Sequence, residues 1–504
     1  MNIKRAKEEI KNTIEAYLLK NEFGEYEILP VHQRPIFLLG APGIGKTQIM
    51  EQISKECRIG LVSYTITHHT RQSAIGLPFI SEKEYNRVPH KVTEYTMSEI
   101  VAAVYDKIED SGMKEGILFI DEINCVSETL APAMLQFLQY KTFGSHQIPQ
   151  GWLIVAAGNP PEYNRSVREF DVVTMDRVKK IQVEPDFAAW KEYAYKEGIH
   201  PAVLSYLNLR PASFYKMEST VDGKRFVTPR GWEDLSRLLQ VYEKIQKKAD
   251  REVIVQYLQY PQIARDFANY LELYEKYQAD YQIEAVLEGK TEEILLKKLS
   301  HAAFDERLSV TGLILSGCSR EFEKSCRKKE QLKVLYPILL SCKEVLLGEG
   351  KEPPVEFMET VISEYQARWE RQKKAELLSR KELHCCLYVT GRLESFLQKM
   401  KKEAVTDGAA AFALLKEEFA KEKQEALEAE RKAGETLEHA FDFMEAAFLG
   451  GQEMVIFLTE LNTGFYSLQF LSEYSCKRYE QYNRELLYRE NRREILRRIE
   501  ELQI

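Results

Sequence analysis

The first pattern with chemical meaning is a glycine-rich run that ends in a lysine and a threonine. It fits the spacing G-x-x-x-x-G-K-[ST] and stands between the apolar run 36–39 and a helical pattern. Glycines let backbone N–H groups close around phosphates, and a helix N-terminus adds donors and a favourable dipole. We therefore predict a phosphate site for ATP, and not a plain glycine-rich turn, at Gly40, Gly43, Ile44, Gly45, Lys46 and Thr47.

Carboxylates follow a second apolar run. The stretch Ile117–Ile120 is followed directly by Asp121 and Glu122. In open α/β folds, ligands bind at the carboxyl ends of the strands. We expect Thr47 and Asp121 to hold Mg²⁺, Lys46 to reach the β- and γ-phosphates, and Glu122 to act as general base on the attacking water. A solvated strand end is the alternative for this acidic pair.

An uncharged amide stands at the end of a third apolar run. The stretch 152–157 ends in Gly158, Asn159 and Pro160. At the same edge of the sheet as Asp121, the Asn159 side chain is placed to orient the lytic water or to contact the γ-phosphate. Because Asn before Pro is also a common turn former, a structural role is the alternative.

Taken together, these motifs resemble the MoxR family of AAA+ ATPases. The residues that carry the resemblance are Asp121-Glu-Ile-Asn124, a following helix, Ala157-Gly-Asn159-Pro, and Met175-Asp-Arg177. That family is close to the magnesium-chelatase ATPase subunit and to gas-vesicle and nitric-oxide-reductase accessory ATPases. The resemblance covers about residues 30–240 and implies an AAA+ fold in which Asn159 has the role called sensor 1.

The resemblance also implies two catalytic arginines. Arg177 is expected to enter the neighbouring subunit's site as an arginine finger, although Val178 stands where the family has Phe. Arg165 and Arg168 are rival fingers, and capping of a local carboxylate is the other reading of Arg177. Arg230 precedes a helical pattern where AAA+ lids carry the sensor 2 arginine, with an ordinary surface arginine as the alternative.

The segment 67–72 is polar and contains adjacent histidines, His68 and His69. Neighbouring residues of a strand point to opposite faces, so a shared metal ion is not expected. We interpret the segment as a substrate-contacting loop, with a simple polar loop as an equal alternative.

The elements that must position these residues follow from periodicity. Strands are expected at 36–39, 60–67, 116–120, 152–157 and 180–183, and helices near 47–57, 97–108 and 127–139. Beyond Pro185, helical periodicity dominates, as in 232–245 and 263–277. The predicted fold is a three-layer αβα P-loop core with a parallel sheet, then a helical lid and a long helical C-terminal region.

Four regions are expected along the chain. They are an N-terminal amphipathic helix (1–22), an AAA+ core (23–185), a helical lid and extension (186–347) and a helical C-terminal domain (348–504). The residues Gly348 to Pro354 form the best linker candidate. The segment from Lys416 to Glu438, rich in Ala, Glu and Lys, predicts a long exposed helix or a coiled-coil arm.

Composition narrows the class of function. The 504 residues carry a formal net charge of −8, so no basic field attracts nucleic acid or anionic membranes. The eight cysteines lack the CxxC pairs typical of zinc or redox sites. No apolar stretch is long enough to span a membrane, and no signal peptide is evident, so a cytoplasmic protein is expected.

The leading sequence-based hypothesis is a ring-forming homo-oligomer, expected to be hexameric, that uses ATP hydrolysis to remodel a protein partner. A trans-acting arginine requires a head-to-tail interface, and such an interface forms a ring when its rotation closes. The MoxR resemblance implies a partner with a von Willebrand factor A domain and a chaperone-like role. The alternatives are a nucleotide-gated assembly scaffold and a nucleic-acid motor.

Overall fold

The computed structural model describes residues 1–68, 71–143, 146–163, 167, 170–220, 223–348, 353–448 and 451–486. The chain divides into two compact units. The first unit, named here the sheet unit, comprises Met1–Ala189, Thr228–Arg230 and Ala367–Leu383. The helical unit comprises Trp190–Val227, Gly231–Gln366 and the residues from His384 onward.

The sheet unit is built on five parallel strands in the order β2-β5-β8-β1-β9. Each matches a predicted strand, although β2 is shorter than the predicted 60–67 because a 3₁₀ turn begins at Ile66. The fold-class prediction is confirmed. Strand β5 is flanked by β2 and β8, and its residues Ile117 to Ile120 are fully buried because helices cover both faces of a parallel sheet. The strands are β1 (Ile36–Gly40), β2 (Gly60–Thr65), β5 (Gly116–Asp121), β8 (Trp152–Gly158) and β9 (Lys179–Val183).

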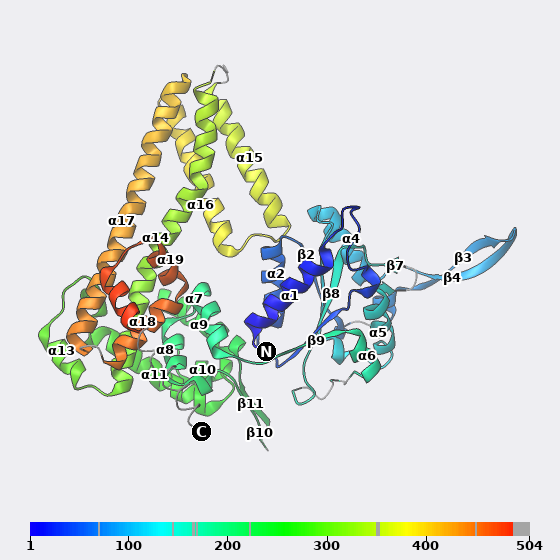
Figure 1. Cartoon of the computed structure of the whole chain (residues 1–504), viewed down its shortest axis with the longest axis horizontal. Coiled ribbons are helices and arrows are strands. Elements are labelled where there is room, and N and C mark those ends of the chain that lie inside the picture. The colour runs from blue at the N-terminus through cyan, green and yellow to red at the C-terminus, as the bar shows by residue number, and fades with distance from the viewer. Residues whose placement is uncertain are drawn as a thin grey trace, which may run out of the picture. The chain divides into compact units, whose positions relative to one another are not determined.

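Helices form the outer layers of this unit (Figure 1). On one face, α4 and α5 contribute Val104 and Phe137 to a core that includes Leu118 and Ile154 of the sheet. Helices α1 and α2 pack against each other, and α2 contacts β2 and β5. The helices are α1 (Ile3–Leu18), α2 (Lys46–Cys57), α3 (Arg71–Ile75), α4 (Glu99–Ser111), α5 (Ala131–Tyr140) and α6 (Val172–Arg177).

A long β-hairpin is the main feature of this unit that the sequence analysis did not predict. Strands β3 (Pro78–Tyr85) and β4 (Val88–Tyr95) pair with each other and extend away from the sheet (Figure 1). Most of their residues are exposed, so the sequence lacks the alternation of apolar and polar residues that marks a half-buried strand. A second, very short pair joins β6 (Thr142–Phe143) to β7 (His146–Gln147).

The helical unit confirms the prediction that helices dominate after the sheet, with one exception. Its hairpin of β10 (Lys216–Thr220) and β11 (Gly223–Val227) was not expected. Tyr206, Trp232 and Phe267 pack ring against ring in one core, with centroids 5.2–5.6 Å apart. The helices that follow β9 are α7 (Phe187–Glu197), α8 (Pro201–Leu209), α9 (Pro229–Lys244), α10 (Arg251–Tyr257), α11 (Pro261–Asp280), α12 (Ile283–Leu287), α13 (Glu293–Ser300), α14 (Phe304–Leu346), α15 (Pro354–Lys374), α16 (Arg380–Lys402), α17 (Gly408–Phe448), α18 (Gln452–Thr463) and α19 (Phe465–Glu473).

Helix α17 contains the segment predicted as an exposed helix or a coiled-coil arm. It packs along α14 over much of its length (Figure 1), and Ala426, Ala433 and Leu437 are buried. Two of its carboxylates, Glu418 and Glu422, are also buried, in ion pairs that involve basic residues of α16 and α17. The predicted long helix is present, but one of its faces is buried, so it is not exposed on all sides. No helix among the described residues has the length and apolar character needed to cross a membrane.

Candidate functional site

The predicted phosphate loop lies between β1 and α2, at the carboxyl edge of the sheet. Gly43 and Gly45 have φ angles of 74° and 94°, in the left-handed region that favours glycine. A Cβ atom at Gly43 would lie 2.9 Å from Oγ1 of Thr228, and one at Gly40 would lie 2.7 Å from the Val183 carbonyl oxygen. The loop thus follows a path that needs glycine, and it leads directly into the first turn of α2, whose N–H groups have no intrahelical acceptor.

Lys46 is the buried cation of this loop. Its Nζ atom donates to the carbonyl oxygens of Gly40 at 2.7 Å and Ala41 at 2.9 Å, and to Oδ1 of Asn159 at 2.9 Å. Burial lowers the pKa of Lys46 to about 8, against the opposing attraction of the Asp121 carboxylate. The Lys46 ammonium thus donates its hydrogen bonds to uncharged oxygens. Its positive charge therefore remains available to attract a phosphate.

Thr47 and Asp121 lie together, as the sequence analysis expected of a magnesium site. The Thr47 hydroxyl donates to Oδ2 of Asp121 at 3.1 Å, and Oδ1 of Asp121 accepts from the Glu122 N–H at 2.9 Å. Oxygen ligands of this kind suit Mg²⁺. Mg²⁺ usually keeps several water ligands and binds substrate phosphates, so one hydroxyl and one carboxylate would suffice from the protein.

Glu122 begins the segment that leaves the sheet after β5. It has a φ angle of 56°, the left-handed conformation that is uncommon outside glycine, and it caps the short 3₁₀ turn Ile123–Cys125. Such strain is a feature of functional sites. Asn159 directly follows β8, and its carboxamide lies beside Lys46. The ends of β1, β5 and β8, which are far apart in the sequence, thus lie together at the carboxyl edge of the sheet.

Comparison with known proteins agrees with this geometry. Residues 35–178 match the model of the AAA domain (dynein-related subfamily). The chain contains an AAA domain. Among solved structures, the chain is similar to a RuvB mutant from Thermotoga maritima, with 15% identity and a TM-score of 0.28, over 51% of this chain and 69% of that one. No curated protein matches the chain.

Arg230 stands at the start of α9, beside the phosphate loop of the AAA domain. Its backbone N–H donates to the Gly43 carbonyl at 3.2 Å, and the neighbouring Thr228 is buried against Gly43. The positive charge of Arg230 acts on Lys46 and contributes to the lowered pKa of that lysine. The predicted contact of the Arg230 side chain with a γ-phosphate stays a prediction.

Arg177 is the last residue of α6, and its side chain is exposed. Its Nη1 atom donates to Oε1 of Gln139 at 2.6 Å, and no described contact joins it to the phosphate loop. Val178, the departure from the MoxR pattern, is buried in the core beneath the sheet. The rival candidates Arg165 and Arg168 lie outside the described residues.

The sequence analysis gave no role to Asn124, which the AAA domain places inside the site. Its buried carboxamide makes two hydrogen bonds to the backbone of Asn159. The only feature of the sequence that could have indicated a role for Asn124 was its place in the motif Asp121-Glu-Ile-Asn124, which carries the family resemblance. The polar segment 67–72 is described only in part, with a 3₁₀ turn at Ile66–His68 and the start of α3 at Arg71, and its proposed contact with a substrate stays a prediction.

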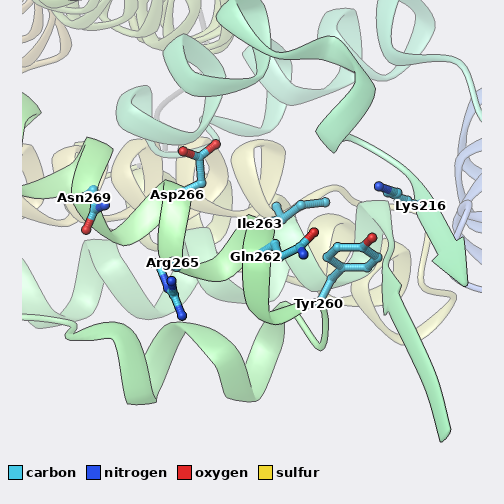
Figure 2. Close-up of a pocket in the computed structure, with 7 residues that line it drawn as sticks. All are labelled: Lys216, Tyr260, Gln262, Ile263, Arg265, Asp266 and Asn269. Atoms are coloured by element: carbon cyan, nitrogen blue, oxygen red, sulfur yellow. The ribbon is translucent and has the colours of Figure 1, made fainter. Parts of the chain in front are cut away.

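A pocket of about 310 Å³ lies in the helical unit (Figure 2) and contains none of the predicted site residues. The Tyr260 hydroxyl in its wall donates to Glu218 at 2.6 Å, and the Lys216 ammonium lies 4.6 Å from the centre of the Tyr260 ring. Asp266 accepts from the Tyr206 hydroxyl at 2.9 Å. Lys216, Tyr260 and Asp266, three of the polar residues in the pocket wall, thus make contacts within the helical unit.

Proposed function

We propose that this chain hydrolyses ATP to ADP and phosphate with the help of Mg²⁺. The observation that carries the proposal is the meeting of Lys46, Thr47 and Asp121 at one edge of a parallel sheet. Lys46 and the loop N–H groups hold the β- and γ-phosphates, and Thr47 and Asp121 hold the metal ion, which neutralises charge on the phosphates. Glu122 polarises the attacking water, and Asn159 orients it.

Separation of binding from turnover tests this assignment. Lys46→Ala should abolish ATP binding, whereas Glu122→Gln should bind ATP with unchanged affinity and lose turnover. The control is Glu128→Gln, which removes an exposed carboxylate from the same connection outside the site. Equal loss of ATP affinity in the Lys46 and Glu122 variants would remove the base role from Glu122, and absence of hydrolysis in the wild-type chain would refute the proposal.

We further propose that the chain works as a hexameric ring of the MoxR type, in the cytoplasm, and remodels a protein partner that carries a von Willebrand factor A domain. The resemblance of the site motifs to that family supports this proposal. The Glu122→Gln form should trap the ATP-bound complex, so affinity capture with ATP and with ADP, followed by mass spectrometry, is the test. Enrichment of a von Willebrand factor A protein only with ATP supports it, and enrichment of nucleic acid instead favours a motor.

The scaffold alternative differs in one measurable respect. A nucleotide-gated scaffold assembles on ATP binding and needs no turnover. In that case the Glu122→Gln form should assemble its partner complex and complete its function as well as wild type does. Loss of function in this variant, with assembly intact, favours the remodelling ATPase.

A further inference from the structure

The end of β5, with Asp121 and Glu122, lies beside β8, the strand that leads to Asn159. Strands β5 and β8 pair in parallel register up to Ile120 and Ala156. Beyond that point, Glu122 has a left-handed conformation and leads into the 3₁₀ turn Ile123–Cys125, which ends the strand. The β5–β8 register ends at Ala156, three residues before Asn159, so no peptide of β5 pairs with the backbone of Asn159.

The carboxamide of Asn124 takes the place of such a peptide. Its Nδ2 atom donates to the Asn159 carbonyl oxygen at 2.8 Å, and its Oδ1 atom accepts from the Asn159 N–H at 3.3 Å. One side chain thus satisfies both the donor and the acceptor of one residue, as a neighbouring strand would. Asn124 is only 4% exposed, so water cannot readily replace these bonds.

Two neighbouring features fit this arrangement. Pro160 and Pro161 follow Asn159 and have no N–H group, so the segment cannot continue the ladder by itself. A Cβ atom at Gly158 would lie 2.6 Å from Oδ1 of Asn124, closer than real Cβ atoms come. The absence of a side chain at Gly158 therefore makes room for the Asn124 carboxamide.

The contact extends to the phosphate loop, because the Asn159 side chain accepts from Lys46 at 2.9 Å. We propose that Asn124 is a positioning residue for ATP hydrolysis: it fixes the backbone of Asn159, so that the Asn159 side chain stays aligned with Lys46 and the γ-phosphate. This role rests on the proposed ATPase function. Asn124 itself touches neither nucleotide nor metal in this role, and it acts through Asn159.

Kinetics of Asn124→Ala test the role. Misplacement of a positioned group by about 1 Å can cost on the order of 10²-fold in rate. We therefore expect kcat to fall on the order of 10²-fold while KM for ATP changes by less than about threefold, because the phosphate loop is unaltered. Gly158→Ala should reproduce this loss, since the added methyl group displaces the same carboxamide.

Asn124→Asp supplies a readout that a purely structural role does not move. A protonated Asp can donate its O–H to the Asn159 carbonyl and accept from the Asn159 N–H, but an ionised Asp can only accept. The rate of Asn124→Asp, divided by that of wild type at each pH, should therefore rise as the pH is lowered. The same ratio for Asn124→Ala should stay flat, and division by the wild-type rate corrects for the pH effects that both chains share.

The control is Ser54→Ala, which removes a buried hydrogen bond of the Ser54 hydroxyl to the Ile59 carbonyl at the other end of α2. It should keep the wild-type kcat even if it lowers the melting temperature. If the wild-type chain is active and Asn124→Ala has the wild-type kcat, the positioning role is refuted and the proposed function is not. The same holds if kcat and KM of Asn124→Ala change equally. A wild-type chain without ATPase activity refutes the proposed function and the positioning role together.

Discussion

The ammonium of Lys46 lies 2.9 Å from Oδ1 of Asn159, although 113 positions separate the two residues in the chain. The contact joins the phosphate loop to the end of β8 before any phosphate is bound. Because Lys46 is buried among neutral oxygens, its pKa is lowered to about 8. The charge on which phosphate binding depends is therefore titratable near physiological pH.

ATP affinity should depend on pH for this reason. A bound phosphate favours the charged amine and raises its pKa, so at pH values above about 8 the free protein must take up a proton to bind ATP. We expect Kd to be nearly constant below about pH 7, to be about doubled at pH 8, and to rise by up to about tenfold per pH unit above that. Titration with a fluorescent ATP analogue measures this change, and circular dichroism checks that the fold persists.

Lys46→Arg is the matched variant for this experiment. A guanidinium stays charged over the whole range, so any residual ATP affinity of this variant should not fall above pH 8. A wild-type Kd that is unchanged from pH 8 to 9.5 would contradict the lowered pKa of Lys46.

Thr47 should determine the magnesium requirement of the reaction. Its hydroxyl lies 3.1 Å from Asp121, and removal of one oxygen ligand weakens a metal site. In Thr47→Ala, the Mg²⁺ concentration that gives half of the maximal rate should rise on the order of 10- to 100-fold. Thr47→Ser keeps the hydroxyl and should stay within about threefold of wild type. Identical Mg²⁺ titrations for the Ala variant and wild type would show that the hydroxyl is not a ligand.

Binding to nucleic acid should be weak. The chain has a formal net charge of −8, and an acidic surface repels phosphate backbones. At physiological salt we expect a Kd of roughly 10⁻⁴ M or weaker for DNA and RNA, the non-specific range. Fluorescence anisotropy with labelled oligonucleotides, repeated at several salt concentrations, measures it. A micromolar complex with a steep salt dependence would put the nucleic-acid motor ahead of the remodelling ATPase.

The sequence predicted the sheet and the phosphate loop because their signals are local. Buried parallel strands are continuous apolar runs, and the spacing of Gly40, Gly43, Gly45 and Lys46 specifies a loop by itself. The carboxyl ends of parallel strands share one edge, so the juxtaposition of Thr47 and Asp121 followed from topology.

The features that the sequence did not predict lack such a local signal. The β3–β4 hairpin, Pro78 to Tyr95, exposes most of its residues, and its pairing leaves no apolar periodicity in the sequence. The buried face of α17 is made partly of alanines such as Ala426 and Ala433, which are hard to distinguish from those of an exposed helix. The role of Asn124 depends on where the chain leaves β5, a property of three-dimensional geometry.

The last prediction concerns Arg177, whose guanidinium is exposed and whose described hydrogen bond is to Gln139. If Arg177 acts in trans, it stabilises the charge that develops on the γ-phosphoryl group of the neighbouring subunit. Such a finger speeds turnover on the order of 10³- to 10⁵-fold, or about 4 to 7 kcal/mol. Arg177→Ala should therefore bind ATP nearly normally and hydrolyse it very slowly. Gln139→Ala leaves the guanidinium in place and should retain most of the activity.

Mixed rings distinguish a trans role from a local one. Glu122 and Arg177 serve one shared site from opposite subunits, so a mixture of Glu122→Gln and Arg177→Ala chains contains some interfaces in which both intact residues meet. Titration of one inactive variant into the other should therefore restore part of the ATPase activity, with ring size followed in parallel by analytical ultracentrifugation. A cis-acting or purely structural Arg177 allows no such rescue, because every subunit then lacks one essential group. If mixed rings form and stay inactive, the trans role is excluded, and Arg165 and Arg168 become the candidates to substitute next.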